Sequence, residues 1–104
     1  MIGIILSVVV PLLEPMPYLS SERMAEIDSF VRKQVSFPKR EFAVKISGLC
    51  GDGVKGTYSF STDTVCFDGF DEEIFAHEVA HAYGMDEEWA EEVAWEWIKQ
   101  KKRE

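Results

Sequence analysis

The chain contains little histidine, little cysteine and little positive charge. Its 104 residues include 2 His, 2 Cys and 11 Lys or Arg against 19 Asp or Glu, which makes the formal net charge −8. This charge argues against general binding of nucleic acid. Two cysteines are too few for a Cys₄ zinc module, and their sparse placement does not indicate a disulfide scaffold. We therefore expect Cys50 and Cys66 to be reduced thiols in a cytoplasmic protein, with a bridge between them as the alternative.

The chain also lacks an apolar run long enough to cross a membrane. Its most apolar stretch, residues 1–13, is too short for a transmembrane helix. That stretch has neither the basic start nor the small-residue cleavage site of a signal peptide. Three consecutive valines at 8–10, closed by Pro11, instead predict a buried strand, and we expect no membrane partner.

The remaining periodicity predicts one domain with α+β architecture. Apolar residues at helical spacing predict a helix from a cap at Ser20 or Ser21 to about Val35. Alternation predicts strands over residues 41–47, with Phe42, Val44 and Ile46 on one side, and over 57–61 and 64–67, while the glycine-rich segment 48–56 reads as a turn. Two further helices follow, so the expected order is β-α-β-β-β-α-α. This order predicts a small three- to four-stranded sheet backed by a helix.

The two histidines stand four residues apart in the segment His77-Glu78-Val79-Ala80-His81. On a helix this spacing places both imidazoles on one face, about 6 Å apart along the axis, where they can converge on one Zn²⁺ at roughly 2.0–2.1 Å each. Glu78 is turned about 100° from His77 and lies beside the metal rather than on it. The H-E-x-x-H pattern therefore predicts a zinc site in which Glu78 is the general base of peptide hydrolysis. The alternative is a buried helix with two hydrogen-bonded core histidines.

A hydrolytic zinc site needs three protein ligands and one open position. Because both histidines are already used, the third ligand has to be a carboxylate or, less readily, Cys66 or Cys50. Only residues 84–86 separate the last two predicted helices, which indicates an antiparallel hairpin. Pairing the helices about residue 85 brings Glu91 between the histidines. Glu91 is the predicted third ligand, and the alternatives are Glu88 and Glu92.

Gly84 introduces another alternative, because H-E-x-x-H-x-x-G is how metzincin peptidases begin, with a third ligand three residues after the glycine. That position is Glu87 here, and no Met-turn follows. No histidine remains to stabilise the oxyanion of the reaction; a tyrosine could do so, and Tyr83 and Tyr58 are the candidates. Taken alone, each tyrosine is better explained as a packing residue. A module that binds zinc and a partner protein without useful catalysis is the alternative function.

The last helix carries a second pattern. Residues 91–94 read Glu-x-x-Ala, and Trp97 stands six residues after Glu91. With H-E-x-x-H this resembles the gluzincin metallopeptidases, over residues 71–98, and the resemblance implies that Glu91 is the third zinc ligand. The size and element order resemble the minigluzincins, peptidases of roughly a hundred residues from thermophilic prokaryotes. Only nine residues separate His81 from Glu91, fewer than in larger gluzincins.

The resemblance implies a minimal zincin-like domain over residues 1–104. Residues 1–70 would form the sheet and the backing helix, 71–98 the active-site and glutamate helices, and 99–104 a basic tail. It also implies a peptide or protein substrate and a zymogen whose C-terminal segment folds back or is exchanged between molecules. Ten acidic residues between 71 and 98 precede four basic ones in 99–104, which would favour such a contact, or self-association. The alternative is that the tail only caps the last helix against its dipole.

Overall fold

A computed structural model describes residues 18–36, 40–51 and 53–103 of the protein. The strand predicted within residues 1–13 lies outside this part. The described elements, in chain order, are α2 (Ser21–Lys33), β1 (Ala43–Ile46), β2 (Gly56–Ser59), β3 (Thr64–Phe67), α3 (Glu72–Ala82) and α4 (Glu87–Lys102). No helix within the described residues is both long and apolar enough to cross a membrane.

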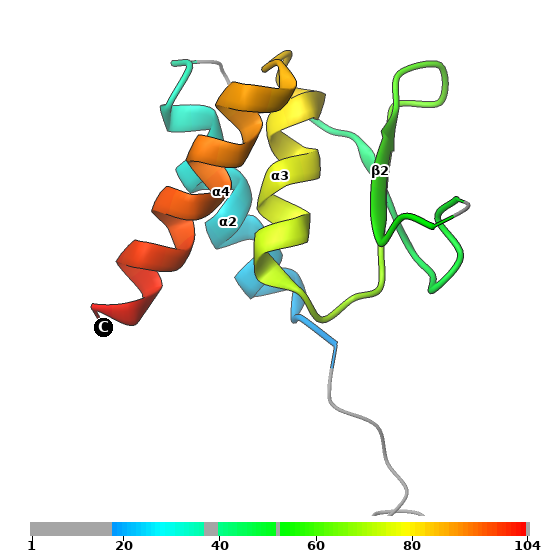
Figure 1. Ribbon diagram of the computed structural model, residues 1–104, viewed down its shortest axis with the longest axis horizontal. Helices are drawn as coiled ribbons and strands as arrows, with labels where there is room; N and C mark the ends of the chain where they lie inside the picture. Colours follow the sequence, from blue (N-terminus) through cyan, green and yellow to red (C-terminus); the bar gives the residue numbers. More distant parts are fainter. Residues whose placement is uncertain (1–17, 37–39, 52, 104) are drawn as a thin grey trace, which may run out of the picture.

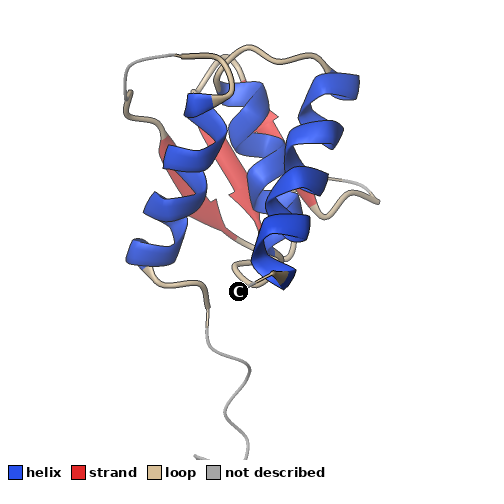
Figure 2. Cartoon of the chain, turned by 90° about the vertical axis from the view of Figure 1, so that its left-hand side faces the viewer, coloured by secondary structure: helices blue, strands red, loops and turns tan. Residues whose placement is uncertain are grey.

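The protein has the predicted α+β architecture, a three-stranded mixed sheet with three helices packed against it. The strand order is β1-β3-β2, with β1 parallel and β2 antiparallel to the central β3. All three helices lie on the same face of the sheet (Figures 1 and 2). Helix α3 contacts β2 and β3 directly, and α2 and α4 pack against α3. The helix with both histidines therefore lies next to an edge strand of the described sheet.

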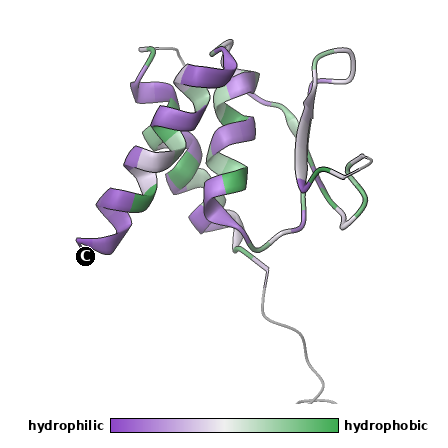
Figure 3. Ribbon diagram, viewed as in Figure 1, coloured by the Kyte–Doolittle hydropathy of each residue, from purple (hydrophilic) through white to green (hydrophobic). Residues whose placement is uncertain are grey.

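Each helix begins at a side chain that accepts a hydrogen bond from the first turn. Ser20 accepts from the amide of Arg23 at 3.0 Å, Asp71 from Ile74 at 3.1 Å and Asp86 from Trp89 at 2.8 Å. Such caps satisfy amides that have no partner inside the helix. Glutamates follow in the first turns of α3 and α4, where the helix dipole favours negative charge. Most of α4 is coloured hydrophilic in Figure 3, as its acidic sequence predicts.

The core lies where α2, α3 and α4 meet one another and the sheet. Val65 and Phe67 of β3 are fully buried, and the Phe67 ring lies 4.8 Å from that of Phe75 in α3. By register, Val44 and Ile46 of β1 face the same side as these two residues. They are nevertheless 39% and 40% exposed, because β1 is an edge strand of the described sheet that the helices cover incompletely. Sequence alternation showed which side they share but not that this side is half open.

The prediction of two reduced thiols is wrong, because Cys50 and Cys66 form a disulfide. Cys66 lies on the central strand β3, and Cys50 follows β1 in the loop that leads to β2. Strand β1 pairs with β3 in parallel, so the loop leaving β1 passes close to Cys66 and brings the two Cα atoms to 5.7 Å. This proximity depends on the strand order, which the spacing of two cysteines does not encode.

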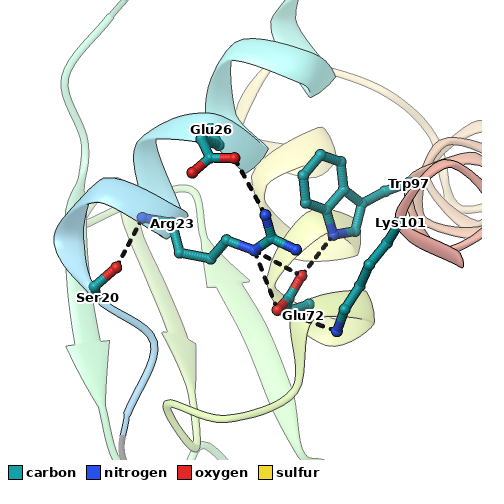
Figure 4. A network of polar contacts seen from close by, with 6 residues as sticks. All are labelled: Ser20, Arg23, Glu26, Glu72, Trp97 and Lys101. Carbon is teal, nitrogen blue, oxygen red and sulfur yellow. Dashed lines mark hydrogen bonds and ion pairs between the residues drawn. The ribbon is translucent and has the colours of Figure 1, made fainter. Parts of the chain in front are cut away.

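Glu72, at the start of α3, joins all three helices (Figure 4). Its carboxylate accepts a hydrogen bond from the indole of Trp97 at 2.9 Å and lies 3.3 Å from Nε of Arg23 and 3.2 Å from Nζ of Lys101. The Arg23 guanidinium also lies over the Trp97 ring, 5.0 Å from its centroid. Burial would raise the pKa of Glu72, but the bonds from Trp97, Arg23 and Lys101 hold it below its ordinary value.

Candidate metal centre

Helix α3 places His77 and His81 on one face with their side chains directed to one point. The Nε2 atoms of the two rings lie 3.2 Å apart. A carboxylate oxygen of Glu87, in the first turn of α4, lies 3.0 Å from His77 Nε2 and 2.8 Å from His81 Nε2. These three side chains form a candidate metal-binding group. The histidine spacing in the sequence therefore produces the predicted convergence.

The ring orientation of His81 is set by the end of its own helix. Gly84 has φ +88°, and the amides of Gly84 and Met85 donate back to the carbonyls of His81 and Ala80 at 2.9 and 3.0 Å. This is the Schellman arrangement, which favours glycine at the left-handed position. It places the carbonyl of Met85 2.9 Å from Nδ1 of His81. Because a carbonyl only accepts, Nδ1 carries a proton, and Nε2 is the ring nitrogen that faces the group.

The group has the donor set and the spacing of a tetrahedral metal site. Two imidazole nitrogens and a carboxylate oxygen within 3.2 Å of one another repel unless a positive charge, either a shared proton or a metal ion, lies among them. Atoms that bind zinc at 2.0–2.1 Å in tetrahedral geometry lie about 3.3–3.4 Å apart. The observed separations are slightly shorter, so the side chains need to move by only a few tenths of an ångström to bind the ion.

Glu78, the residue predicted to be the general base, lies beside the candidate metal-binding group. It lines both of the cavities that His77 lines, one of about 660 Å³ and one of about 490 Å³. Burial raises the pKa of the Glu78 carboxyl, and the charges of His77 and His81 act in the opposite direction. Glu78 is thus partly withdrawn from solvent, next to the metal group and open to a cleft.

The cleft is closed on one side by the edge strand β2, which approaches α3 very closely at Gly56. A Cβ on Gly56 would lie 2.4 Å from Ile74 Cγ2 and 3.3 Å from Glu78 Cγ. Only glycine allows this approach. Residues of β2 and of the loop before it line the larger cavity, together with Asp71, Glu73, Glu91 and Trp95 from the two helices. Thr57, Tyr58 and Phe60 line the smaller one beside Glu87.

The structure brings Glu87, not Glu91, to the two histidines. Glu91 lies one turn further along α4 and lines the larger cavity with His77 and Glu78. Glu88 and Glu92 are exposed and line neither cavity. The sequence signal for Glu87 was Gly84, since the reversal of the chain at this glycine lets a side chain three residues later fold back onto the histidines. Hydrogen bonds with His81 and His77 lower the pKa of the Glu87 carboxyl, although its side chain is 71% exposed.

The two candidate tyrosines lie in different surroundings. The hydroxyl of Tyr83 donates to Asp28 of α2 at 2.7 Å inside the core, where burial raises the pKa of Tyr83 to about 12. Tyr58 lines the smaller cavity with both histidines, but its hydroxyl donates to Asp63. Arg40 donates to the same carboxylate at 2.7 Å and to the carbonyl of Ala82 at the end of α3. Both tyrosines line a further cavity with His81, but of the two only Tyr58 also lines the cavity that contains both histidines.

The basic residues that precede the C-terminus continue α4 as far as Lys102. Lys99 pairs with Glu96 at 2.7 Å, and Lys101 pairs with Glu72. None of residues 99–103 lines the two cavities at Glu78. In this conformation the described part of the tail acts as a helix end.

Comparisons with known proteins identify no relative: no protein-family model, no curated protein and no solved structure matches the chain.

Proposed function

We propose that the protein is a zinc-dependent peptidase whose metal is held by His77, His81 and a carboxylate of α4. The observation that supports this best is the convergence of two imidazole Nε2 atoms and a carboxylate oxygen next to Glu78, in a cleft. Imidazole and carboxylate ligands suit zinc, and three protein ligands leave a fourth position for water. The resemblance to the gluzincins, and to the minigluzincins in particular, remains a prediction from the motifs.

Glu87 is the third ligand that the geometry favours, because it already contacts both histidines. A bound zinc ion would polarise the peptide carbonyl and lower the pKa of the attacking water. Glu78 takes the proton from that water and transfers it to the nitrogen of the leaving amine.

The substrate class that fits the cleft is an extended peptide. In the described sheet β2 pairs only with β3, so its other edge presents backbone groups on the side of the metal group. A peptide can bind such an edge as an added strand, with affinity from backbone hydrogen bonds and little dependence on sequence. Phe60, which is 90% exposed at the hairpin tip, offers an apolar contact at the same wall.

A zinc-binding interaction module is the second candidate function. The hydrogen bonds of the two candidate tyrosines favour this function. The Tyr83 hydroxyl donates to Asp28 in the core, and the Tyr58 hydroxyl donates to Asp63. A phenol has one proton to donate, so Tyr58 would have to release Asp63 before it could stabilise an oxyanion.

The substitution Glu78→Gln separates the two functions. It preserves size and should leave zinc binding within a few-fold, whereas peptide cleavage should fall by at least about 100-fold, as expected for loss of a general base. The measurements are zinc content and turnover of a broad peptide library by the full chain. Glu96→Gln, the same change at an exposed position of α4, is the control and should cleave like the wild type. Equal behaviour of wild type and Glu78→Gln would favour the module.

The predicted latency and the predicted cytoplasmic location belong to this proposal. Latency would require residues 99–103 to leave α4 or to act on another molecule.

A cytoplasmic location fits the disulfide if the source is a hyperthermophile, because disulfides persist inside such cells and rarely in other cytosols.

A further inference from the structure

We infer that the Cys50–Cys66 disulfide positions the wall of the cleft, so that its reduction weakens peptide binding while the metal ligands stay in place. This inference rests on the proposed peptidase function and concerns the regulation of that same site. The two cysteines are 16 residues apart in the sequence. The segment between them contains the whole of β2 and the residues before it that line the cleft.

The enclosed segment supplies one entire side of both cavities at Glu78. Val54, Lys55 and Gly56 line the larger cavity, and Gly56, Thr57, Tyr58 and Phe60 line the smaller one. The opposite side of each cavity comes from α3 and α4. The width of the cleft is therefore the distance at which this segment is held from α3.

The segment is tied to the rest of the described structure through β2, which pairs with β3 and packs against α3, and through Asp63, which accepts a hydrogen bond from Arg40. The loop before β2 has fewer ties. In the loop that leads to β2, Leu49 donates to Ser47 and Val54 to Gly51, so these bonds stay within the loop. The side chains of Leu49 and Val54 are 86% and 44% exposed and contribute little burial. The covalent bond fastens this loop to β3, beside Thr57, which is the β2 partner of Cys66.

The disulfide holds β2 at a position where a small displacement of the strand changes the width of the cleft. Gly56 lies against Ile74 and Glu78 with no room for a methyl group, so an outward shift of β2 widens the cleft directly at Glu78. The metal group does not depend on this wall. His81 is oriented by Met85, and Glu87 follows the turn at Gly84, all within the α3–α4 hairpin.

The disulfide can be reached by a reductant through one of its sulfurs. Cys66 is 6% exposed, whereas Cys50 is half-buried in the surface loop. A thiolate of a small dithiol attacks the Cys50 sulfur, forming a mixed disulfide and releasing the Cys66 thiolate, which takes up a proton. The second thiol of the reductant then displaces Cys50, so that the protein gains two thiols and the dithiol becomes a cyclic disulfide. Two electrons and two protons are transferred in total.

The test uses the zinc-loaded full chain, oxidised or treated with dithiothreitol. We expect reduction to speed hydrogen exchange of the amides of residues 53–59 by about tenfold or more, as for a local opening. KM for peptide cleavage should rise about tenfold, while zinc content and the helical circular dichroism remain unchanged. The variant Cys50→Ser/Cys66→Ala should behave like the reduced protein and should not respond to dithiothreitol.

Unchanged exchange across residues 53–59, or unchanged KM, would overturn the inference. Loss of zinc or of helical signal in Cys50→Ser/Cys66→Ala, measured without dithiothreitol because a dithiol itself binds zinc, would overturn it as well, because the effect of losing the disulfide would then be global. If the oxidised, zinc-loaded protein cleaves no peptide, the proposed function fails, and hydrogen exchange still decides whether the disulfide holds the wall.

Discussion

At the scale of single residues, Gly84 connects local backbone conformation to the candidate metal centre. Its φ of +88° closes the end of α3 and sets the Met85 carbonyl against His81. Gly84→Ala has open space for the methyl group, so the change acts through backbone strain alone. We expect it to lower the free energy of unfolding by about 1 kcal/mol and zinc affinity by roughly tenfold, as when an outer-shell partner of a ligand is disturbed.

Chemical unfolding and calorimetric zinc titration measure these two effects. Gly53→Ala is the matched control, because Gly53 also has a positive φ, of +70°, with open space around it, and it lies in the loop before β2. It should lose similar stability and keep its zinc affinity. A Gly84→Ala protein that binds zinc like the wild type would contradict the role given to the Met85 carbonyl.

The choice between Glu87 and Glu91 is also made at the residue scale. Glu87→Gln should weaken zinc binding by more than about 100-fold, since losing a ligand costs more than the ten- to hundredfold of an outer-shell partner. Glu91→Gln, four residues along the same helix, should weaken it by less than about tenfold. Competition with a chelating zinc indicator measures both affinities. The reverse order would make Glu91 the ligand, as the gluzincin resemblance implies, and would show that the Glu87 contact belongs to the metal-free protein.

At the scale of elements, the three helices are joined by charge at Glu72. Its side chain is 11% exposed and meets Trp97, Arg23 and Lys101. Glu72→Gln leaves these donors without a charged acceptor, and we expect it to lower the free energy of unfolding at pH 7 by about 1–3 kcal/mol. Glu26→Gln is the control: Glu26 pairs with the same Arg23 at 3.1 Å but is 59% exposed, so its loss should cost about 0–1 kcal/mol.

The Glu72 contribution also has a defined pH dependence. Because the folded-state pKa lies below the ordinary value of 4.5, the stabilisation is fully present above about pH 4.5 and is lost as the pH falls through the folded-state pKa. Urea unfolding of wild type and Glu72→Gln from pH 7 down to pH 3 should show that the difference between their free energies of unfolding becomes smaller. A difference that stays constant with pH would mean that Glu72 stabilises the fold by its shape and not by its charge.

At the scale of the whole molecule, the parts that could be predicted from the sequence are those set by local chemistry. Helical spacing of apolar residues, Ser20 as a cap and Gly84 as a terminator locate α2, α3 and α4. The four-residue spacing of His77 and His81 locates the centre of the site, because both histidines lie on one rigid helix.

The parts that could not be predicted depend on contacts between distant segments. The Cys50–Cys66 bond follows from the parallel pairing of β1 with β3. The partial exposure of Val44 and Ile46 follows from the position of β1 at the edge of the described sheet, which the helices cover incompletely. The sequence predicts Glu91 rather than Glu87 as the third ligand because the prediction pairs two ideal helices. It ignores how a long side chain in the first turn of α4 bends back over the turn at Gly84.

Anomalous diffraction at the zinc edge, from crystals of the full chain grown with zinc at neutral pH, tests directly whether this helical hairpin holds a metal. We predict one anomalous peak about 2.0–2.2 Å from Nε2 of both His77 and His81 and from a carboxylate oxygen of α4, with the fourth position facing the cleft beside Glu78. Crystals that contain excess zinc but show no peak between the two histidines would contradict the account.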